Sequence, residues 1–183
     1  MAPGEEPRPI RDRIALLAGI LLLCSAALPA VVAAGGESLA LEDRLRRIDQ
    51  FLRDRPAFLT GRSLQELRKL APLRAERIEK EVDPQATDRE LEYRRLNFDG
   101  LELVGRVEAP GGFSPLQVTV TSPRWKLRQG LGVGTPVQRV ESVLGPPMEQ
   151  EEGILRYQGT SEQATFHVRR GVIERVELQY RVD

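Results

Sequence analysis

The side chains that most often carry out catalysis are few in this 183-residue chain. Its only histidine is His167, which lies between Phe166 and Val168 and is therefore expected on the opposite face of a strand from both. A histidine base needs a nucleophile and an orienting group, and no spacing in the sequence marks either one. Paired carboxylates at residues 149–152 belong to a loop run that is ordinarily solvated. We predict a solvated His167 and a protein that is not an enzyme.

The residues that would hold a metal ion or a cofactor are also scarce. Zinc sites use several histidine or cysteine ligands, and the only cysteine, Cys24, lies in the N-terminal apolar segment. Gly130, Gly132 and Gly134 lack the Lys-Ser/Thr of a phosphate-binding loop and the glycine spacing of a dinucleotide site. We interpret them as turn residues before Thr135. No catalytic, cofactor-binding or metal-binding residue is therefore predicted.

Protein contact is the chemistry that the remaining residues favour. Trp125 stands between Arg124 and Lys126, and tryptophan and arginine are enriched in interface hot spots. Phe113, in a Gly-Gly turn, is a second candidate. The alternatives are that Trp125 packs the junction between the two helix-plus-strand units described below, with its charged neighbours pointing outward, and that Phe113 anchors its turn. We predict these four residues as a partner-binding surface, with both alternatives left open.

The charge balance narrows the class of partner. The chain has 27 Lys and Arg residues and 27 Asp and Glu residues, so its formal net charge is zero. A nucleic-acid-binding protein ordinarily carries a basic surplus. We therefore predict a protein partner in the cell envelope or outside the cell, and no nucleic acid.

The N-terminal segment predicts export. Residues 14–36 carry no charge and follow three arginines, which is the layout of a secretory signal with small residues at its end. We place cleavage after Ala34, which leaves the protein periplasmic or secreted. Residues 14–34 are also long enough to span a bilayer, so the alternative is an uncleaved inner-membrane anchor, the only membrane contact expected. Leu23 before Cys24 is too large for a lipobox, so Cys24 is interpreted as an apolar residue of the signal helix.

Hydrophobic periodicity predicts the elements that position these residues. Helical spacing favours an amphipathic helix from Ser38 to about Asp54, with Leu41, Leu45, Ile48 and Leu52 as its buried stripe, and a strongly charged helix over residues 74–82. Two short helices are expected after capping boxes at Ser63–Glu66 and at Thr135–Gln138, with Pro136 in the first helical position. Period-two alternation predicts strands near residues 90–93, 101–107, 116–120, 154–157, 164–168 and 172–180.

The two halves of the chain have similar patterns. The segments 61–72 and 134–146 each give a short capped helix ended by proline, and each leads to three alternating strands. We predict an α+β fold of short helices packed on antiparallel β-sheet, as two tandem helix-plus-three-strand units after the signal helix. The expected boundaries are residues 1–34 for the signal peptide, 35–56 for the amphipathic helix, 57–129 for the first unit and 130–183 for the second.

The run from Gly132 to Tyr180 resembles a known repeat. Its features are Val133-Gly134-Thr135, a helix ending in Leu144-Gly145-Pro146-Pro147, Tyr157, Phe166-x-Val168 and Val176-x-Leu178. It is similar to the repeat of BamE-like (SmpA/OmlA) outer-membrane proteins and of the secreted β-lactamase inhibitor protein. The missing lipobox and the missing mature cysteines depart from these two groups, so no binding residue is transferred.

Together these patterns predict an exported, non-catalytic protein-binding module. One alternative is a hydrolase inhibitor of the β-lactamase type, which the resemblance implies. The other is a structural envelope component held by an uncleaved N-terminal anchor.

Overall fold

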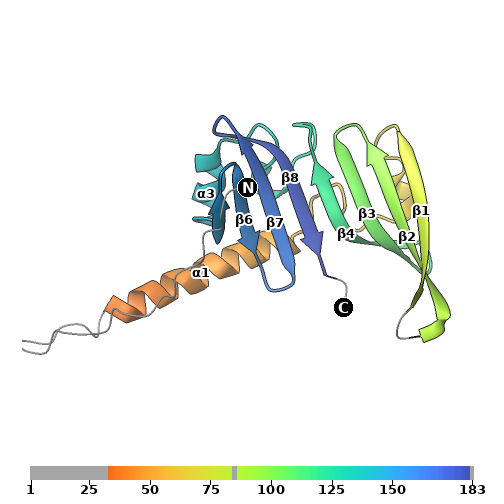
Figure 1. Ribbon diagram of the computed structural model, residues 1–183, viewed down its shortest axis with the longest axis horizontal. Coiled ribbons are helices and arrows are strands. Elements are labelled where there is room, and N and C mark those ends of the chain that lie inside the picture. Colours follow the sequence, from red (N-terminus) through yellow and green to blue (C-terminus); the bar gives the residue numbers. More distant parts are fainter. Residues whose placement is uncertain (1–32, 84–85, 182–183) are drawn as a thin grey trace, which may run out of the picture.

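The computed structural model describes residues 33–83 and 86–181 (Figure 1). The signal peptide predicted over residues 1–34 lies outside these ranges except for its last two residues. The helices are α1 (Ala33–Arg53), α2 (Leu64–Leu67) and α3 (Val137–Leu144), with a 3-10 turn η1 at Arg128–Gly130. The strands are β1 (Ala75–Asp83), β2 (Ala86–Phe98), β3 (Leu101–Glu108), β4 (Gly112–Val120), β5 (Glu149–Glu151), β6 (Ile154–Gln158), β7 (Glu162–Arg169) and β8 (Val172–Tyr180).

The strands form one antiparallel sheet of eight strands in the order β1-β2-β3-β4-β8-β7-β6-β5. Strands β4 and β8 join its two halves, with Val118 opposite Leu178 and Val120 opposite Val176. The fold class predicted from the sequence, two tandem helix-plus-three-strand units, is therefore wrong. Period-two alternation indicates each strand by itself and does not show that β4 and β8 pair into a single continuous sheet.

The charged segment predicted as a helix is β1, the edge strand of this sheet. Ile78 and Val82 are four residues apart, which fits a helical stripe as well as one face of a strand. An edge strand pairs on one side only, and β1 is exposed on both faces over residues 77–82, so no buried face reveals its period of two. The acidic run at 149–152 likewise contributes the short strand β5 at the opposite edge.

The other three predicted helices are present, with one cap misplaced. α1 includes the predicted amphipathic helix and begins earlier, at Ala33. In α2 the capping box is confirmed: Ser63 N donates to Glu66 Oε2 at 2.8 Å and Glu66 N donates to Ser63 Oγ at 3.3 Å. α3 starts one residue later than expected, with Pro136 at the N-cap and no side-chain cap, because Thr135 is buried and its backbone bonds to Ile173.

The core lies between the three helices and one face of the sheet. Alternate residues of the central strands meet there in register, such as Leu103, Val118 and Leu178. α1 lays Ile48, Phe51 and Leu52 against this face, and all three are buried. Polar contacts fix the position of α1: the Asp49 carboxylate accepts from Thr160 N at 2.7 Å and from Thr160 Oγ1 at 2.9 Å, in the β6–β7 turn.

A cluster of four charged residues joins the end of α2 to the β1–β2 hairpin. Arg68 Nε donates to Glu76 Oε2 at 3.0 Å, and Arg94 Nη1 donates to Glu76 Oε1 at 3.0 Å. Arg94 Nε also donates to Glu92 Oε1 at 2.7 Å. The hydrogen bonds from Arg68, followed by its positive charge and that of Arg94, lower the pKa of Glu76 below its ordinary value, against the effect of burial.

Glu76→Gln is expected to lower the free energy of unfolding by about 1 kcal/mol near neutral pH, because the two arginines lose their shared carboxylate. A carboxyl with a lowered folded-state pKa stabilises the fold above its unfolded pKa, and this contribution is lost as the pH falls through the folded value. Urea denaturation at about pH 7 and about pH 3 should therefore show a difference from wild type that shrinks in acid. Glu81→Gln, exposed on the same strand, is the control, and an equal, pH-independent effect of both variants would contradict the prediction.

Candidate functional site

The face of the sheet that points away from the helices, here called the open face, is polar. One row of four glutamines crosses it, with Gln117 of β4, Gln179 of β8, Gln163 of β7 and Gln158 of β6 opposite one another in register. We call this set the amide row. Amide side chains donate and accept hydrogen bonds without carrying charge. The amide row therefore provides an uncharged polar band across four neighbouring strands.

A second row runs parallel to the amide row. Thr119 of β4, Glu177 of β8 and Thr165 of β7 are opposite one another in it. Glu177 is held by its neighbours: Arg175 Nη2 donates to its Oε1 at 2.8 Å, and His167 Nε2 lies 3.2 Å from the same atom. The centre of the open face thus carries one carboxylate, flanked by two hydroxyls and already partnered.

His167 lies on the open face, as the alternation with Phe166 predicted, and it has a partner that the sequence did not reveal. Its ring and the Glu177 carboxylate form an ion pair when the ring is protonated. Among the described side chains, no hydrogen bond joins His167 to a hydroxyl that could act as a nucleophile. Glu177 therefore contacts both His167 and Arg175 on the sheet surface.

Ion pairs stand on both sides of the uncharged band. On the β2–β3 side, Arg95 Nη1 is 2.8 Å from Glu102 Oε1. On the β5–β6 side, Arg156 Nη1 is 3.0 Å from Glu151 Oε1 and 3.3 Å from Glu149 Oε2. The open face therefore has a centre rich in amides and hydroxyls, where Glu177 is paired with Arg175 and His167, and ion pairs on both sides of it.

The four residues predicted to bind a partner do not form one shared surface in the structure. Trp125 is only 6% exposed, and its Nε1 donates to the backbone oxygen of Asp99 at 2.8 Å. Its ring contacts Phe58 and Phe98, with centroid distances of 5.5 and 6.3 Å. Trp125 thus packs within the fold, but these three partners all belong to the predicted first unit, residues 57–129, and not to a junction between two units.

The other three predicted residues do not gather around an exposed tryptophan. Arg124 is exposed and stacks its guanidinium on the Trp125 ring, 5.2 Å from the centroid. Lys126 is exposed, and its Nζ donates to Val133 O at 3.2 Å. Phe113 is buried in β4, where its ring lies against the backbone of Gly105 in β3.

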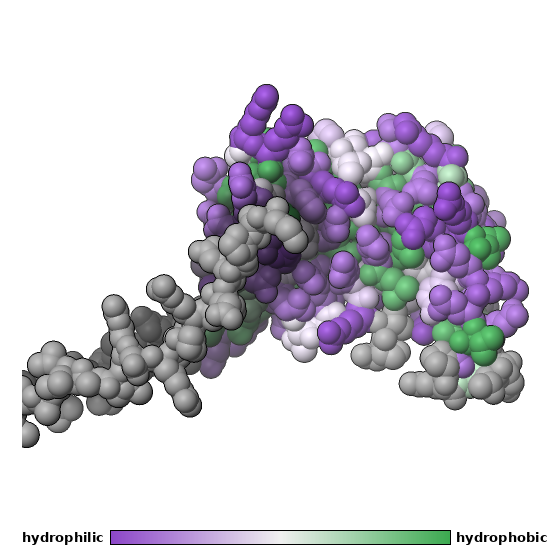
Figure 2. All heavy atoms as spheres, viewed as in Figure 1, coloured by the Kyte–Doolittle hydropathy of each residue, from purple (hydrophilic) through white to green (hydrophobic). Residues whose placement is uncertain are grey.

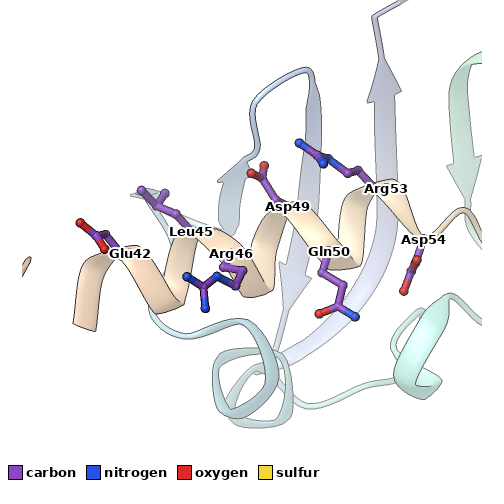
Figure 3. Close-up of a pocket in the computed structure, with 7 residues that line it drawn as sticks. All are labelled: Glu42, Leu45, Arg46, Asp49, Gln50, Arg53 and Asp54. Atoms are coloured by element: carbon purple, nitrogen blue, oxygen red, sulfur yellow. The ribbon is translucent and has the colours of Figure 1, made fainter. Parts of the chain in front are cut away.

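Two of the surface hollows have the volume of a small-molecule site. One of about 540 Å³ runs beside α1, and Figure 3 shows its lining side chains along that helix: Glu42, Leu45, Arg46, Asp49, Gln50, Arg53 and Asp54. Six of them belong to α1 and the seventh, Asp54, directly follows it, so no second described helix or strand contributes a converging group. The other hollow, of about 380 Å³, lies on the open face, and its two arginines already pair, Arg74 with Asp99 and Arg175 with Glu177.

No family model, curated protein or solved structure matches this chain. The resemblance to the BamE-like and β-lactamase inhibitor repeats stays a prediction.

Two further findings concern only residues 33–83 and 86–181. No helix there is long and apolar enough to cross a membrane. In the same ranges, no three His, Cys, Asp or Glu side chains gather as a metal site would require. The anchor predicted over residues 14–34 lies almost wholly outside these ranges.

Proposed function

We propose that this protein is an exported protein-binding module whose contact surface is the open face of the eight-stranded sheet. The observation that carries the proposal is the distribution of charge on that face. The centres of protein interfaces are depleted in charged residues, while their rims are polar and accessible. The amide row with its border of ion pairs has this arrangement.

The proposal names the chemistry of the partner surface. The amide row offers donors and acceptors to an uncharged polar surface, and the bordering pairs Arg95–Glu102 and Arg156–Glu151 offer both signs of charge to its rim. Paired strands hold the backbone of these residues, so little backbone freedom is lost on binding. Export rests on the uncharged segment at residues 14–36 and its preceding arginines.

Site-specific photo-crosslinking tests this proposal. A photoreactive phenylalanine analogue is placed at Gln179, in the amide row, and separately at Gln65, an exposed glutamine of α2 on the helix side. The full chain is expressed in its host and irradiated in the intact envelope. We expect one dominant adduct from position 179 and none of the same mass from position 65.

A matched pair of substitutions gives the quantitative readout. Gln179→Arg puts an unpaired charge in the uncharged band and is expected to weaken binding of the crosslinked partner about tenfold or more, whereas Gln65→Arg leaves it unchanged. Identical adducts at both positions, or equal affinities of the two arginine variants, would overturn the open face as the contact surface.

A further inference from the structure

Strand β1 is an edge with unpaired backbone groups. It has nine residues and pairs only with β2, and it ends the sheet on that side (Figure 1). Ile78 and Val82 share one of its faces and are 53% and 60% exposed, and Figure 2 shows hydrophobic residues at the surface on this side of the molecule. A long exposed edge of this kind is a template for pairing with another strand.

Charged residues usually protect such an edge, because like charges meet when two copies approach. In β1 the order of the charged residues instead favours the pairing of two copies. About Ile78 the charges are antisymmetric: Arg77 is matched by Glu79, and Glu76 is matched by Lys80. A two-fold axis through Ile78 would therefore bring only opposite charges together across the new strand pair.

We propose that two copies of this chain associate by antiparallel pairing of β1 with β1, with Ile78 opposite Ile78. Two Arg77–Glu79 pairs then form on the open face. On the face that carries the helices, two Glu76–Lys80 pairs flank the two Ile78 side chains. Val82 of each copy lies opposite Arg74 of the other.

The neighbouring registers are disfavoured by the same side chains. A two-fold axis at Glu79 places that carboxylate opposite its own copy. An axis at Lys80 places Lys80 opposite Lys80 and Glu79 opposite Glu81, and an axis at Arg77 places Arg77 opposite itself. Like charges directly opposite one another destabilise a strand pair, so the axis at Ile78 is the favoured one.

The surroundings of Arg77 support this register. Within one copy Arg77 is opposite Arg95 of β2, which is a like-charge neighbour that already pairs with Glu102. Arg77 and Glu79 form no ion pair with any described side chain of their own copy. Glu79 of the second copy would supply the opposite charge that Arg77 lacks.

Pairing about a two-fold axis perpendicular to the sheet keeps the open faces of both copies on the same side. Two eight-stranded sheets would become one sheet of sixteen strands. This inference stands without the proposed function. If both hold, the dimer presents two contact surfaces to one partner assembly, which raises the avidity without any new contact.

Disulfide trapping in the full chain tests the register. In a Cys24→Ser background, Ile78→Cys brings two thiols face to face, within the Cα separation of about 4.5–5.5 Å for opposite residues that a disulfide also spans. Val82→Cys is the matched control, since its exposure is similar and it lies on the same face of the same strand. The two Val82 positions would be eight residues apart along the strands, about 26 Å, and out of reach.

Mild oxidation in the host envelope is expected to give a covalent homodimer with Ile78→Cys and none with Val82→Cys. Equal yields from both positions would mean collision rather than pairing. A crosslink from position 78 to a different protein would mean that another strand occupies the edge. Either result, like the absence of any crosslink at position 78, would overturn the proposal.

A charge swap provides a second test, measured by sedimentation of the full chain in detergent. Arg77→Glu and Glu79→Arg should each weaken self-association about tenfold or more, because each variant opposes like charges. Their equimolar mixture should form a heterodimer, and the double variant should dimerise again by itself. Single variants as dimeric as wild type, or no rescue in the mixture, would contradict the pairing even if both variants fold.

Discussion

Trp125→Ala is expected to lower the free energy of unfolding by about 3–5 kcal/mol, the range for removing a large buried aromatic side chain. The ring is enclosed by Phe58 and Phe98, and its N–H bonds to the backbone oxygen of Asp99 at the β2–β3 turn. Truncation leaves a cavity and an unsatisfied carbonyl between these elements. Urea denaturation followed by far-UV circular dichroism measures the loss, because the variant has no tryptophan left to fluoresce.

Two companion variants separate packing from surface contact. Trp125→Phe keeps an aromatic ring and loses the hydrogen bond, so it should cost less than alanine, about 1–3 kcal/mol. Lys126→Ala, next to it and exposed, should change stability by less than about 0.5 kcal/mol. If Trp125→Ala unfolded at the wild-type denaturant concentration, the buried role of this ring would be refuted and the predicted partner-binding surface would regain its support.

The sequence predicts best where one face of an element is buried. Phe166 and Val176 alternate with polar residues and meet in the core, so β7 and β8 are recognisable as strands. Ser63 and Glu66 predict α2 because the capping box is local and needs no tertiary contact. These elements carry their signal within a few residues of chain.

The candidate site was harder to predict from the sequence, because it depends on the register between strands. Counting back from the tight turn at Arg170-Gly171 would place His167 opposite Glu174. A bulge between His167 and Val168 shifts the pairing by one residue, so His167 is opposite Arg175 and shares its face with Glu177. The buried pair Phe166–Val176 could have revealed this shift, since both must face the core.

Predicting the amide row from the sequence requires knowing which distant strands pair. Gln117, Gln179 and Gln163 come from three strands, and two of these, β4 and β8, are far apart in the sequence. Each glutamine alone is an ordinary solvated strand residue. Only the pairing of β4 with β8, which no local pattern specifies, brings them into one row.

Ile48→Ala is expected to lower the free energy of unfolding by about 2–5 kcal/mol, because Ile48 is fully buried between α1 and the sheet. Leu41→Ala, from the same predicted apolar stripe, is the matched control. Leu41 is 46% exposed, and its truncation should change stability by less than about 0.5 kcal/mol. Chemical denaturation of both variants measures the difference.

Comparing the stability losses of Leu41→Ala and Ile48→Ala shows how much of α1 is packed against the sheet. A stripe with period 3.6 predicts equal burial along its length, whereas the structure buries Ile48 and Leu52 and leaves Leu41 outside. Equal losses at positions 41 and 48 would mean that another surface covers the first turns of the helix. No loss at position 48 would mean that α1 is not docked on the sheet, and the core would then lack one of its layers. If only the C-terminal half of α1 is docked on the sheet, the free energy of unfolding must fall strongly at position 48 and hardly at all at position 41.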